Sequence, residues 1–380
     1  MSVGGRMPGP ATGGGPASAC QGGSAAGRSG VAALDEVSEP VTALLDSFLA
    51  ARISDLIKLD PELEAIGIEV AGLVRASGKR LRPAFVYWGH RATGAPHTEA
   101  VYWPAAAVEL LHTFALIHDD VMDRSAVRRG RPAVHESLAQ AHRDEGLAGN
   151  PAWFGVSGAI LAGDLAFVWA DQLLDGSTLD AAALDRARRL FTELRVEVMA
   201  GQYLDLRLAG LDRALEQDAL RVALLKSGRY TVTRPLQLGA AIGGGGELLD
   251  VALRAFGDAI GLAFQLRDDV LGLFGDPETT GKGALSDLRE GKRTVLVLRA
   301  LQLASPAERA VLARILGNRD LDETDANDAR QIIVDCGALD VVERLLASQH
   351  RLACLALAPI PAPARQALAD LADLAAFRAL

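Results

Sequence analysis

The stretch "AAAVELLHTFALIHDDVMDRSAVRRG", residues 105–130, joins a long apolar run to a short segment of acids and arginines. Ala and Leu give the run a high helix propensity, and neither glycine nor proline interrupts it before Gly130. On a helix, Asp119 and Asp123 stand one turn apart and face the same way. Such carboxylates repel one another unless a cation lies between them, and Mg²⁺ suits them because it shares its coordination shell with water and phosphate. The stretch predicts a core helix ending at a metal site, although a solvated helix end with spare acids has the same pattern.

The composition of the whole chain predicts an all-α fold. Of the 380 residues, 49% are hydrophobic and 5% aromatic, and the length suffices for a deep core. Breaks such as "TGAP" and "GGGG" separate apolar segments with helical periodicity. Helices are expected at residues 35–58, 61–76, 80–93, 98–122, 134–143, 153–175, 180–208, 213–228, 230–243, 247–274, 292–302, 306–316, 324–354 and 362–378.

No segment has the alternation of a sheet strand. Residues 34–380 are therefore expected to form a single large helical bundle around a central apolar cavity. Residues 1–33 are rich in Gly, Ala, Ser and Pro and are expected to form a disordered tail.

Charge and cysteine usage exclude several classes of protein. The net charge is −9, and no basic tract indicates nucleic-acid binding. The longest apolar stretch, residues 151–170, carries Asp164 in its middle, so we expect a buried helix and no transmembrane segment. Cys20, Cys336 and Cys354 are widely spaced, which predicts a reduced, cytoplasmic protein without a disulfide framework.

A second acidic pair ends another apolar helix, in "LAFQLRDDVLGLFGD", residues 262–276. Gln265 lies one turn before the pair Asp268 and Asp269 and shares their face. Taken alone, this segment could be a helix end with misplaced acids. Two such helices can instead face each other across a bundle, and they then form an acidic, metal-binding mouth over an apolar cavity.

Basic residues complete the pattern. Each cluster alone is typical of a solvated surface, whereas together they indicate two phosphate groups held at once. They are Lys79, Arg80, Arg82, Arg128, Arg129, Lys226, Lys282 and Lys292. Gln202 and Asp205 share one helix face, either as an ordinary polar stripe or as part of this site. The whole set fits a site that ionises an allylic diphosphate and traps the carbocation with an alkene.

These residues resemble the trans-isoprenyl diphosphate synthases, the polyprenyl synthetase family. The resemblance runs from about residue 40 to the C-terminal region. It rests on motifs that occur in the family's order: "GKRLRP", "LLHTFALIHDDVMDRSAVRRGRPAVH", "AGDLAF", "GQYLDL", "LLKSGRYT", "FQLRDDVLGLFGD" and "GKGALSDLREGKRT".

The resemblance implies a prenyltransferase with Mg²⁺ as cofactor, three ions when substrate is bound. Its substrates are isopentenyl diphosphate and an allylic primer: dimethylallyl, geranyl or farnesyl diphosphate. The implied metal residues are Asp119, Asp120, Asp123, Asp205 and Asp268, with Asp269 nearby. Those implied to bind substrate, or to support binding, are Lys79, Arg82, His112, Arg128, Arg129, Gln202, Lys226, Ser227, Gln265, Lys282 and Lys292.

Product length is implied by residues just before the first motif. One aromatic residue, Phe114, beside the small Ala115 resembles synthases of geranylgeranyl diphosphate (C20), and Leu111 is a further candidate for the cavity wall. A farnesyl or longer-chain synthase is the alternative within the family. A non-catalytic partner subunit and a terpene cyclase are alternatives outside this activity. The family also implies a homodimer, with residues near 98–122 at its interface.

One position departs from the family pattern. The second acidic motif is often DDxxD, but Gly272 stands in its last position and Asp276 lies further on. The metal-binding role of this motif therefore depends mainly on Asp268.

Overall fold

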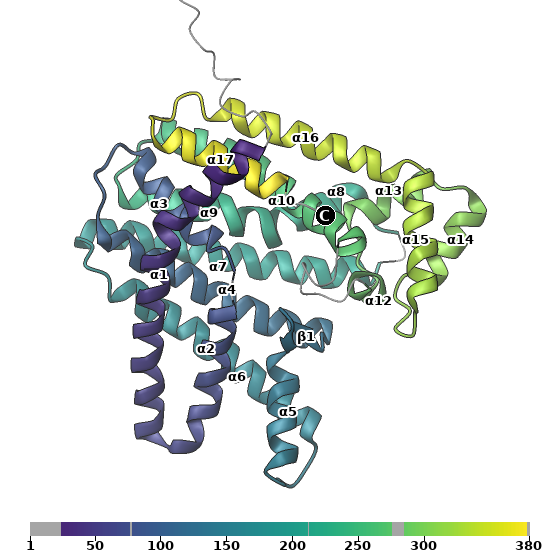
Figure 1. Ribbon diagram of the computed structural model, residues 1–380, viewed down its shortest axis with the longest axis horizontal. Coiled ribbons are helices and arrows are strands. Elements are labelled where there is room, and N and C mark those ends of the chain that lie inside the picture. Colours follow the sequence, from purple (N-terminus) through teal and green to yellow (C-terminus); the bar gives the residue numbers. More distant parts are fainter. Residues whose placement is uncertain (1–23, 77, 212, 276–284, 378–380) are drawn as a thin grey trace, which may run out of the picture.

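Helices make up most of the computed structural model, which describes residues 24–76, 78–211, 213–275 and 285–377 (Figure 1). The α-helices are α1 (Ser24–Leu59), α2 (Glu64–Ala76), α3 (Leu81–Ala92), α4 (Tyr102–Asp123), α5 (Val134–Asp144), α6 (Pro151–Asp175), α7 (Ala181–Ala209), α8 (Glu216–Val222), α9 (Arg234–Ile242), α10 (Glu247–Phe274), α12 (Ser286–Glu290), α13 (Val295–Leu303), α14 (Pro306–Ile315), α15 (Glu323–Asp335), α16 (Ala338–Ala356) and α17 (Ala364–Ala376). Short 3₁₀ turns, Pro61–Leu63 and Glu99–Val101, precede α2 and α4, and a π-helix, η4 (Ala223–Thr233), joins α8 to α9. The predicted all-α class is confirmed.

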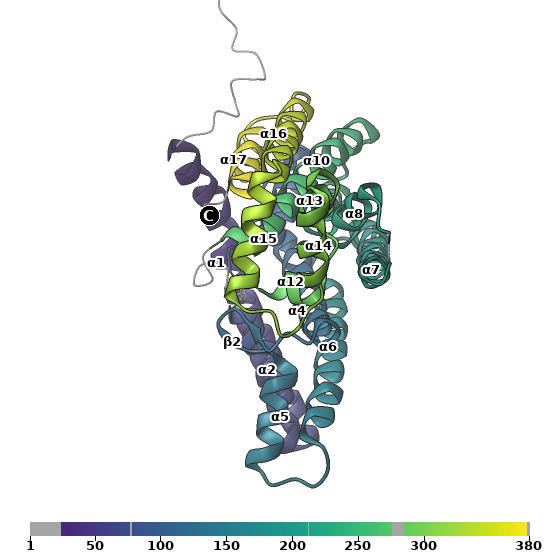
Figure 2. The ribbon, with the colours of Figure 1, turned by 90° about the vertical axis from the view of Figure 1, so that its right-hand side faces the viewer.

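Helix α4 lies in the interior of the bundle. Nearly all of its side chains between Pro104 and Phe114 are buried, and it packs against α6, α3 and α1. Helix α10 is the second internal helix and packs against η4 and α16. Helices α16 and α17 lie across one end of the molecule, and α2 and α5 extend from the other (Figures 1 and 2). The two helices that carry the acidic pairs are therefore both core helices.

Local structure differs from the sequence prediction in several places, among them α12, which lies where no helix was expected. Residues 324–354 form two helices and not one, because Gly337 takes a left-handed conformation (φ 77°) and separates α15 from α16. A break expected near residue 229 is absent, since η4 carries the chain continuously from α8 into α9. A two-residue strand, β1 (Val127–Arg128), pairs with β2 (Arg131–Pro132), although no strand was predicted. Helix α1 begins at Ser24, inside the stretch expected to be a tail.

Two helices are long and apolar enough to cross a membrane by length and composition. They span Glu99–Asp123 and Pro151–Asp175, and the most apolar windows of these segments are 72% and 33% buried inside the molecule. The first is thus packed as a core helix, whereas the second has a large exposed apolar surface. Among the described cysteines, Cys336 is free and partly buried.

Candidate functional site

The C-terminal end of α4 is fixed by an ion pair with the hairpin that follows it. Arg124 takes a left-handed conformation (φ 55°) and ends the helix, and the β1–β2 hairpin then brings Arg128 back toward α4. The Arg128 Nε donates to Asp120 Oδ1 at 2.8 Å, and Nη2 contacts both Asp120 and Asp119 Oδ2. Burial opposes the charged form of Arg128, but these carboxylates more than offset it, and the Arg128 pKa is raised. Asp120 and Arg128 therefore neutralise one another beside the site.

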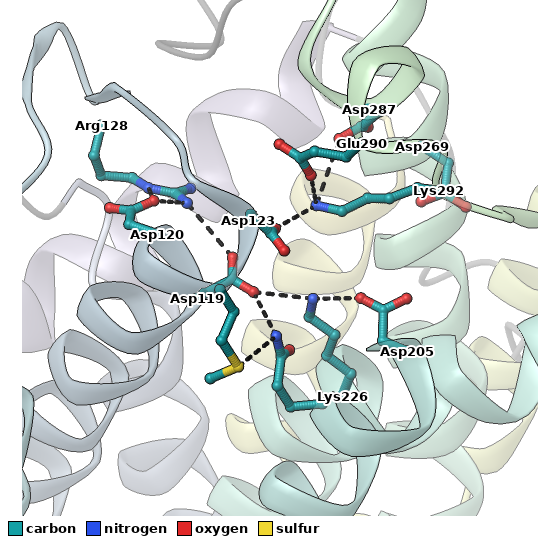
Figure 3. A network of polar contacts seen from close by, with 12 residues as sticks. Asp119, Asp120, Asp123, Arg128, Asp205, Lys226, Asp269, Asp287, Glu290 and Lys292 are labelled. Atoms are coloured by element: carbon teal, nitrogen blue, oxygen red, sulfur yellow. Dashed lines mark hydrogen bonds and ion pairs between the residues drawn. The ribbon is translucent and has the colours of Figure 1, made fainter. Parts of the chain in front are cut away.

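Lys226 joins the end of α4 to α7. Its Nζ lies 3.1 Å from Asp119 Oδ1 and 2.7 Å from Asp205 Oδ2 (Figure 3). Gln202 Nε2 donates to the same Asp119 oxygen at 3.0 Å. The approach of α7 to η4 requires Gly201, since a Cβ there would overlap the Lys226 backbone. Burial lowers the Lys226 pKa, but Asp119 and Asp205 reverse this effect and raise it above the usual value.

Lys292 makes the corresponding link on the other side. Its Nζ lies 2.8 Å from Asp123 Oδ2, 2.6 Å from Glu290 Oε2 and 3.8 Å from Asp287 Oδ1 (Figure 3). The chain turns back at Gly291 (φ 69°), which lets Lys292 face the helix it has just left. Burial raises the Glu290 pKa to about 7; Lys292 opposes this and Asp123 adds to it. A single ammonium group thus connects α4 to α12.

The acids of α10 face the same space. Asp269 is buried and accepts a hydrogen bond of 2.7 Å from Gln265 Nε2. Burial raises the Asp269 pKa well above its usual value; Gln265 opposes this, and the negative charges of Asp287, Asp268 and Asp205 add to it. Asp268 is partly exposed. Acids from α4, α7, α10 and α12 therefore lie in one region of the molecule.

A basic cluster, defined as Arg80, Arg82, His112 and Arg129, lies on the α3 side of α4. Arg82 Nη2 donates to Thr231 Oγ1 at 2.9 Å, and its guanidinium group lies 4.8 Å from the Tyr230 ring centre. Burial holds the His112 pKa well below its usual value, and the positive charges of Arg82, Arg129, Arg128 and Arg80 lower it further.

Burial also lowers the pKa of Arg129. Glu109 opposes this effect, and the positive charges of the neighbouring arginines add to it. Arg80 is offset by a buried ion pair of 2.9 Å with Glu109. Neutral His112 beside two partly buried guanidinium groups fits a bound anion.

The structure brings most of the predicted site residues together. Lys79 is exposed at the start of α3, Ser227 lies next to Lys226, and Lys282 lies outside the described residues. Leu111 is fully buried, and Ala115 packs at the edge of the core. The Phe114 ring contacts the rings of His118 and Phe167, with centres 4.7 Å and 5.0 Å away. Of the candidate chain-length residues, Phe114 thus faces α6.

Sequence reasoning missed three residues of this region. Asp287 and Glu290 belong to the quoted motif "GKGALSDLREGKRT", but only the basic residues of that motif were assigned roles. Phe167 stands at the end of "AGDLAF", and its contact with Phe114 depends on how α6 crosses α4. The acids of α12 could have been identified from their motif, whereas the contact between Phe114 and Phe167 could not be predicted from the sequence.

The acids fit Mg²⁺ bound together with a phosphate ligand. Among the residues that the structure describes, no three His, Cys, Asp or Glu side chains already form a metal cage. Lys226 and Lys292 instead lie between carboxylates of different helices. Mg²⁺ commonly takes only one or two carboxylates and completes its shell with water and substrate phosphates. Asp119 and Asp123, which face the same space from one helix, suit that mode.

Comparison with known proteins gives a consistent result. Residues 68–333 match the polyprenyl synthetase family. The geranylfarnesyl diphosphate synthase of Aeropyrum pernix is 36% identical over 71% of this chain and 80% of its own. The geranylgeranyl diphosphate synthase of Methanosarcina mazei is 34% identical over 73% of this chain and 78% of its own.

A solved structure gives the same result. The geranylgeranyl pyrophosphate synthase of Corynebacterium glutamicum, complexed with isoprenyl diphosphate and magnesium, superposes with a TM-score of 0.86 at 38% identity. The match covers 90% of this chain and 99% of that one.

Proposed function

The chain belongs to the polyprenyl synthetase family, and on that premise we propose that it condenses isopentenyl diphosphate with an allylic diphosphate in a head-to-tail reaction. The observation that carries the proposal is the convergence of Asp119, Asp123 and Asp205 with two lysines beside a separate basic cluster. One anionic substrate fits the acids through Mg²⁺, and a second fits the arginines directly.

The allylic diphosphate is assigned to the acidic side. When bound with this substrate, Mg²⁺ supplies positive charge that stabilises the departing diphosphate. Asp119, Asp123 and Asp268 are proposed to hold it, and Lys226 and Lys292 to turn from carboxylates toward phosphate oxygens. Lys226 is suited to this because its raised pKa keeps the ammonium charged. Three ions per site is the number we propose.

The diphosphate of isopentenyl diphosphate is assigned to the basic cluster. Arg82 and Arg129 supply charge-assisted hydrogen bonds, and neutral His112 can donate or accept one. Binding at two neighbouring sites would hold the alkene of one substrate near the allylic carbon of the other. Once the new carbon–carbon bond has formed, a proton leaves, and the released diphosphate is its proposed acceptor. No protein nucleophile is required.

Geranylgeranyl diphosphate is the product we propose. Phe114 packs edge-on against Phe167, and the pair would close the path of a growing chain between α4 and α6. The relatives include synthases of both geranylgeranyl and geranylfarnesyl diphosphate, so similarity alone does not fix the length.

A homodimer is proposed on a different face from the one the sequence indicated. Helix α4 is mostly internal, whereas α6 exposes Trp153 (68%) and Leu161 (60%), and α7 exposes Val196 (62%) and Tyr203 (63%). The two helices lie on one side of the molecule (Figure 2). Apolar side chains exposed together in this way are typical of a protein interface.

The cytoplasm is the location we propose.

The test is an assay of product length. The purified chain, incubated with Mg²⁺, isopentenyl diphosphate and each allylic primer, is expected to give a C20 product. A main product of C15, or of C30 and above, would overturn the geranylgeranyl assignment but leave the reaction class intact. No product with any primer would support a non-catalytic partner subunit. Cyclised hydrocarbon from an allylic diphosphate alone would support a terpene cyclase.

A further inference from the structure

Gly272 stands one turn after Asp268 on α10, in the position where the family's acidic motif often has its last aspartate. Any side chain at this position would project from the same face as Asp268. A Cβ built on Gly272 would come within 2.5 Å of Asp287 Oδ2, and this oxygen is its nearest neighbour. The carboxylate of Asp287 therefore lies where a side chain at position 272 would begin.

Asp287 reaches this position from α12. Its side chain is 18% exposed and lies 3.8 Å from the ammonium of Lys292, which also binds Asp123 on α4 (Figure 3). It lies close enough to Asp269 to act on it as a like charge. Its carboxylate thus lies between the acids of α4 and those of α10.

We propose that Asp287 supplies, from α12, the carboxylate that the α10 motif lacks at Gly272, and that it belongs to the residues that hold magnesium diphosphate. The inference rests on the proposed function and deepens it. Gly272 and Asp287 then belong together. The glycine leaves room for the Asp287 carboxylate, and this acid from α12 replaces an acid of the α10 motif. Lys292 holds Asp287 and Asp123 when no metal is bound.

A side chain at position 272 and the present position of the Asp287 carboxylate are incompatible, because Asp287 Oδ2 would have to move aside for the Cβ. Two carboxylates so near one another would also repel unless a cation lay between them. Replacing Gly272 by alanine removes no charge but displaces the Asp287 carboxylate. This gives a variant that perturbs Asp287 without altering it, and replacing glycine by alanine within a helix favours the folded backbone.

The experiment measures Mn²⁺ binding in the presence of inorganic pyrophosphate, by electron paramagnetic resonance, on the full chain. Asp287→Asn is expected to weaken this binding about 10-fold or more. Gly272→Ala is expected to weaken it as well, and Gly272→Ala with Asp287→Asn to weaken it no further than Asp287→Asn alone. Gly272→Asp with Asp287→Asn is expected to regain part of the affinity. The matched control is Asp328→Asn, which replaces an exposed aspartate of α15 and should bind Mn²⁺ with pyrophosphate as the unaltered chain does.

Unaltered binding by Asp287→Asn would overturn the inference, and so would additive losses in the Gly272→Ala pair. A Gly272→Asp, Asp287→Asn protein that binds no better than Asp287→Asn would also overturn it. Circular dichroism on each variant separates lost binding from lost folding. If Asp287→Asn binds normally while Asp119→Asn does not, and the unaltered chain makes product, only this inference fails. If the unaltered chain neither binds Mn²⁺ with pyrophosphate nor makes product, the proposed function fails with it.

Discussion

The ammonium of Lys226 lies 3.1 Å from an oxygen of Asp119, although the two residues are 107 positions apart in the chain. The same ammonium binds Asp205 of α7, so three helical elements, α4, α7 and η4, meet at one charge. This positive charge lies where the proposed activity requires cations. Replacing Lys226 should therefore lower the free energy of unfolding when no metal is bound, and it should slow catalysis when metal is bound.

Lys226→Met leaves Asp119 and Asp205 facing one another without an ammonium. Removing one member of such a partly buried group is expected to lower the free energy of unfolding by up to about 3 kcal/mol in the absence of metal. Mg²⁺ with pyrophosphate should restore part of this loss, and product formation should fall about 100-fold. Chemical denaturation with and without both ligands measures the first effect, and steady-state assays the second.

The matched control is Lys58→Met, which removes an exposed ion pair with Asp55 on α1. Exposed ion pairs contribute little to stability, so this variant should behave as the unaltered chain does. Equal responses of the two variants to Mg²⁺ and pyrophosphate would contradict the assigned role of Lys226.

Phe114→Ala is expected to lengthen the product, because it opens the contact between α4 and α6. Phe167 remains behind it, so Phe114→Ala with Phe167→Ala should give longer chains still. Liquid chromatography with mass detection reads the length directly. Phe48→Ala, which removes a partly buried ring of α1, should leave the product unchanged. Because a core Phe→Ala change costs about 3–5 kcal/mol, thermal midpoints must show that each variant is folded. Unchanged length in both altered enzymes would remove this pair from product control.

His112 should make the protein less stable in mild acid. Burial and the surrounding arginines hold its folded pKa well below the ordinary value of 6.5. As the pH falls below about 6.5, the unfolded chain takes up a proton that the folded chain refuses, so the free energy of unfolding decreases. His112→Gln removes this proton uptake and should flatten the pH dependence of stability between about pH 6.5 and 5. Denaturation midpoints across that range measure it.

The matched control is His97→Gln, which replaces an exposed histidine and should leave the pH dependence of stability unchanged. If stability falls as steeply with pH in His112→Gln as in the unaltered chain, other groups cause the acid sensitivity.

Leu161→Arg should prevent dimer formation, because it places a charge in the exposed apolar face of α6. Sedimentation velocity is expected to show a monomer where the unaltered chain is a dimer. Leu248→Arg changes an equally apolar residue, 87% exposed at the start of α10, and should leave the dimer intact. A dimer that persists in Leu161→Arg would place the interface elsewhere.

The sequence by itself determined the helical class and most of the chemistry. Helical periodicity and high helix propensity are local properties, and they located α4 and α10 closely, including the acids at their C-terminal ends. Residue type also predicted that acids and bases would face two phosphate groups. Features that depend on single backbone angles were missed, such as the break at Gly337 and the hairpin that returns Arg128 to Asp120.

Only the tertiary structure decided which charges meet. The pairing of Lys226 with Asp119 and Asp205, the link from Asp123 through Lys292 to α12, and the contact of Phe114 with Phe167 all join residues far apart in the chain. Such contacts depend on how helices cross and how closely their backbones approach, which local spacing does not encode. The same holds for Gly272: the sequence shows a missing acid, and the fold places Asp287 against the vacant position.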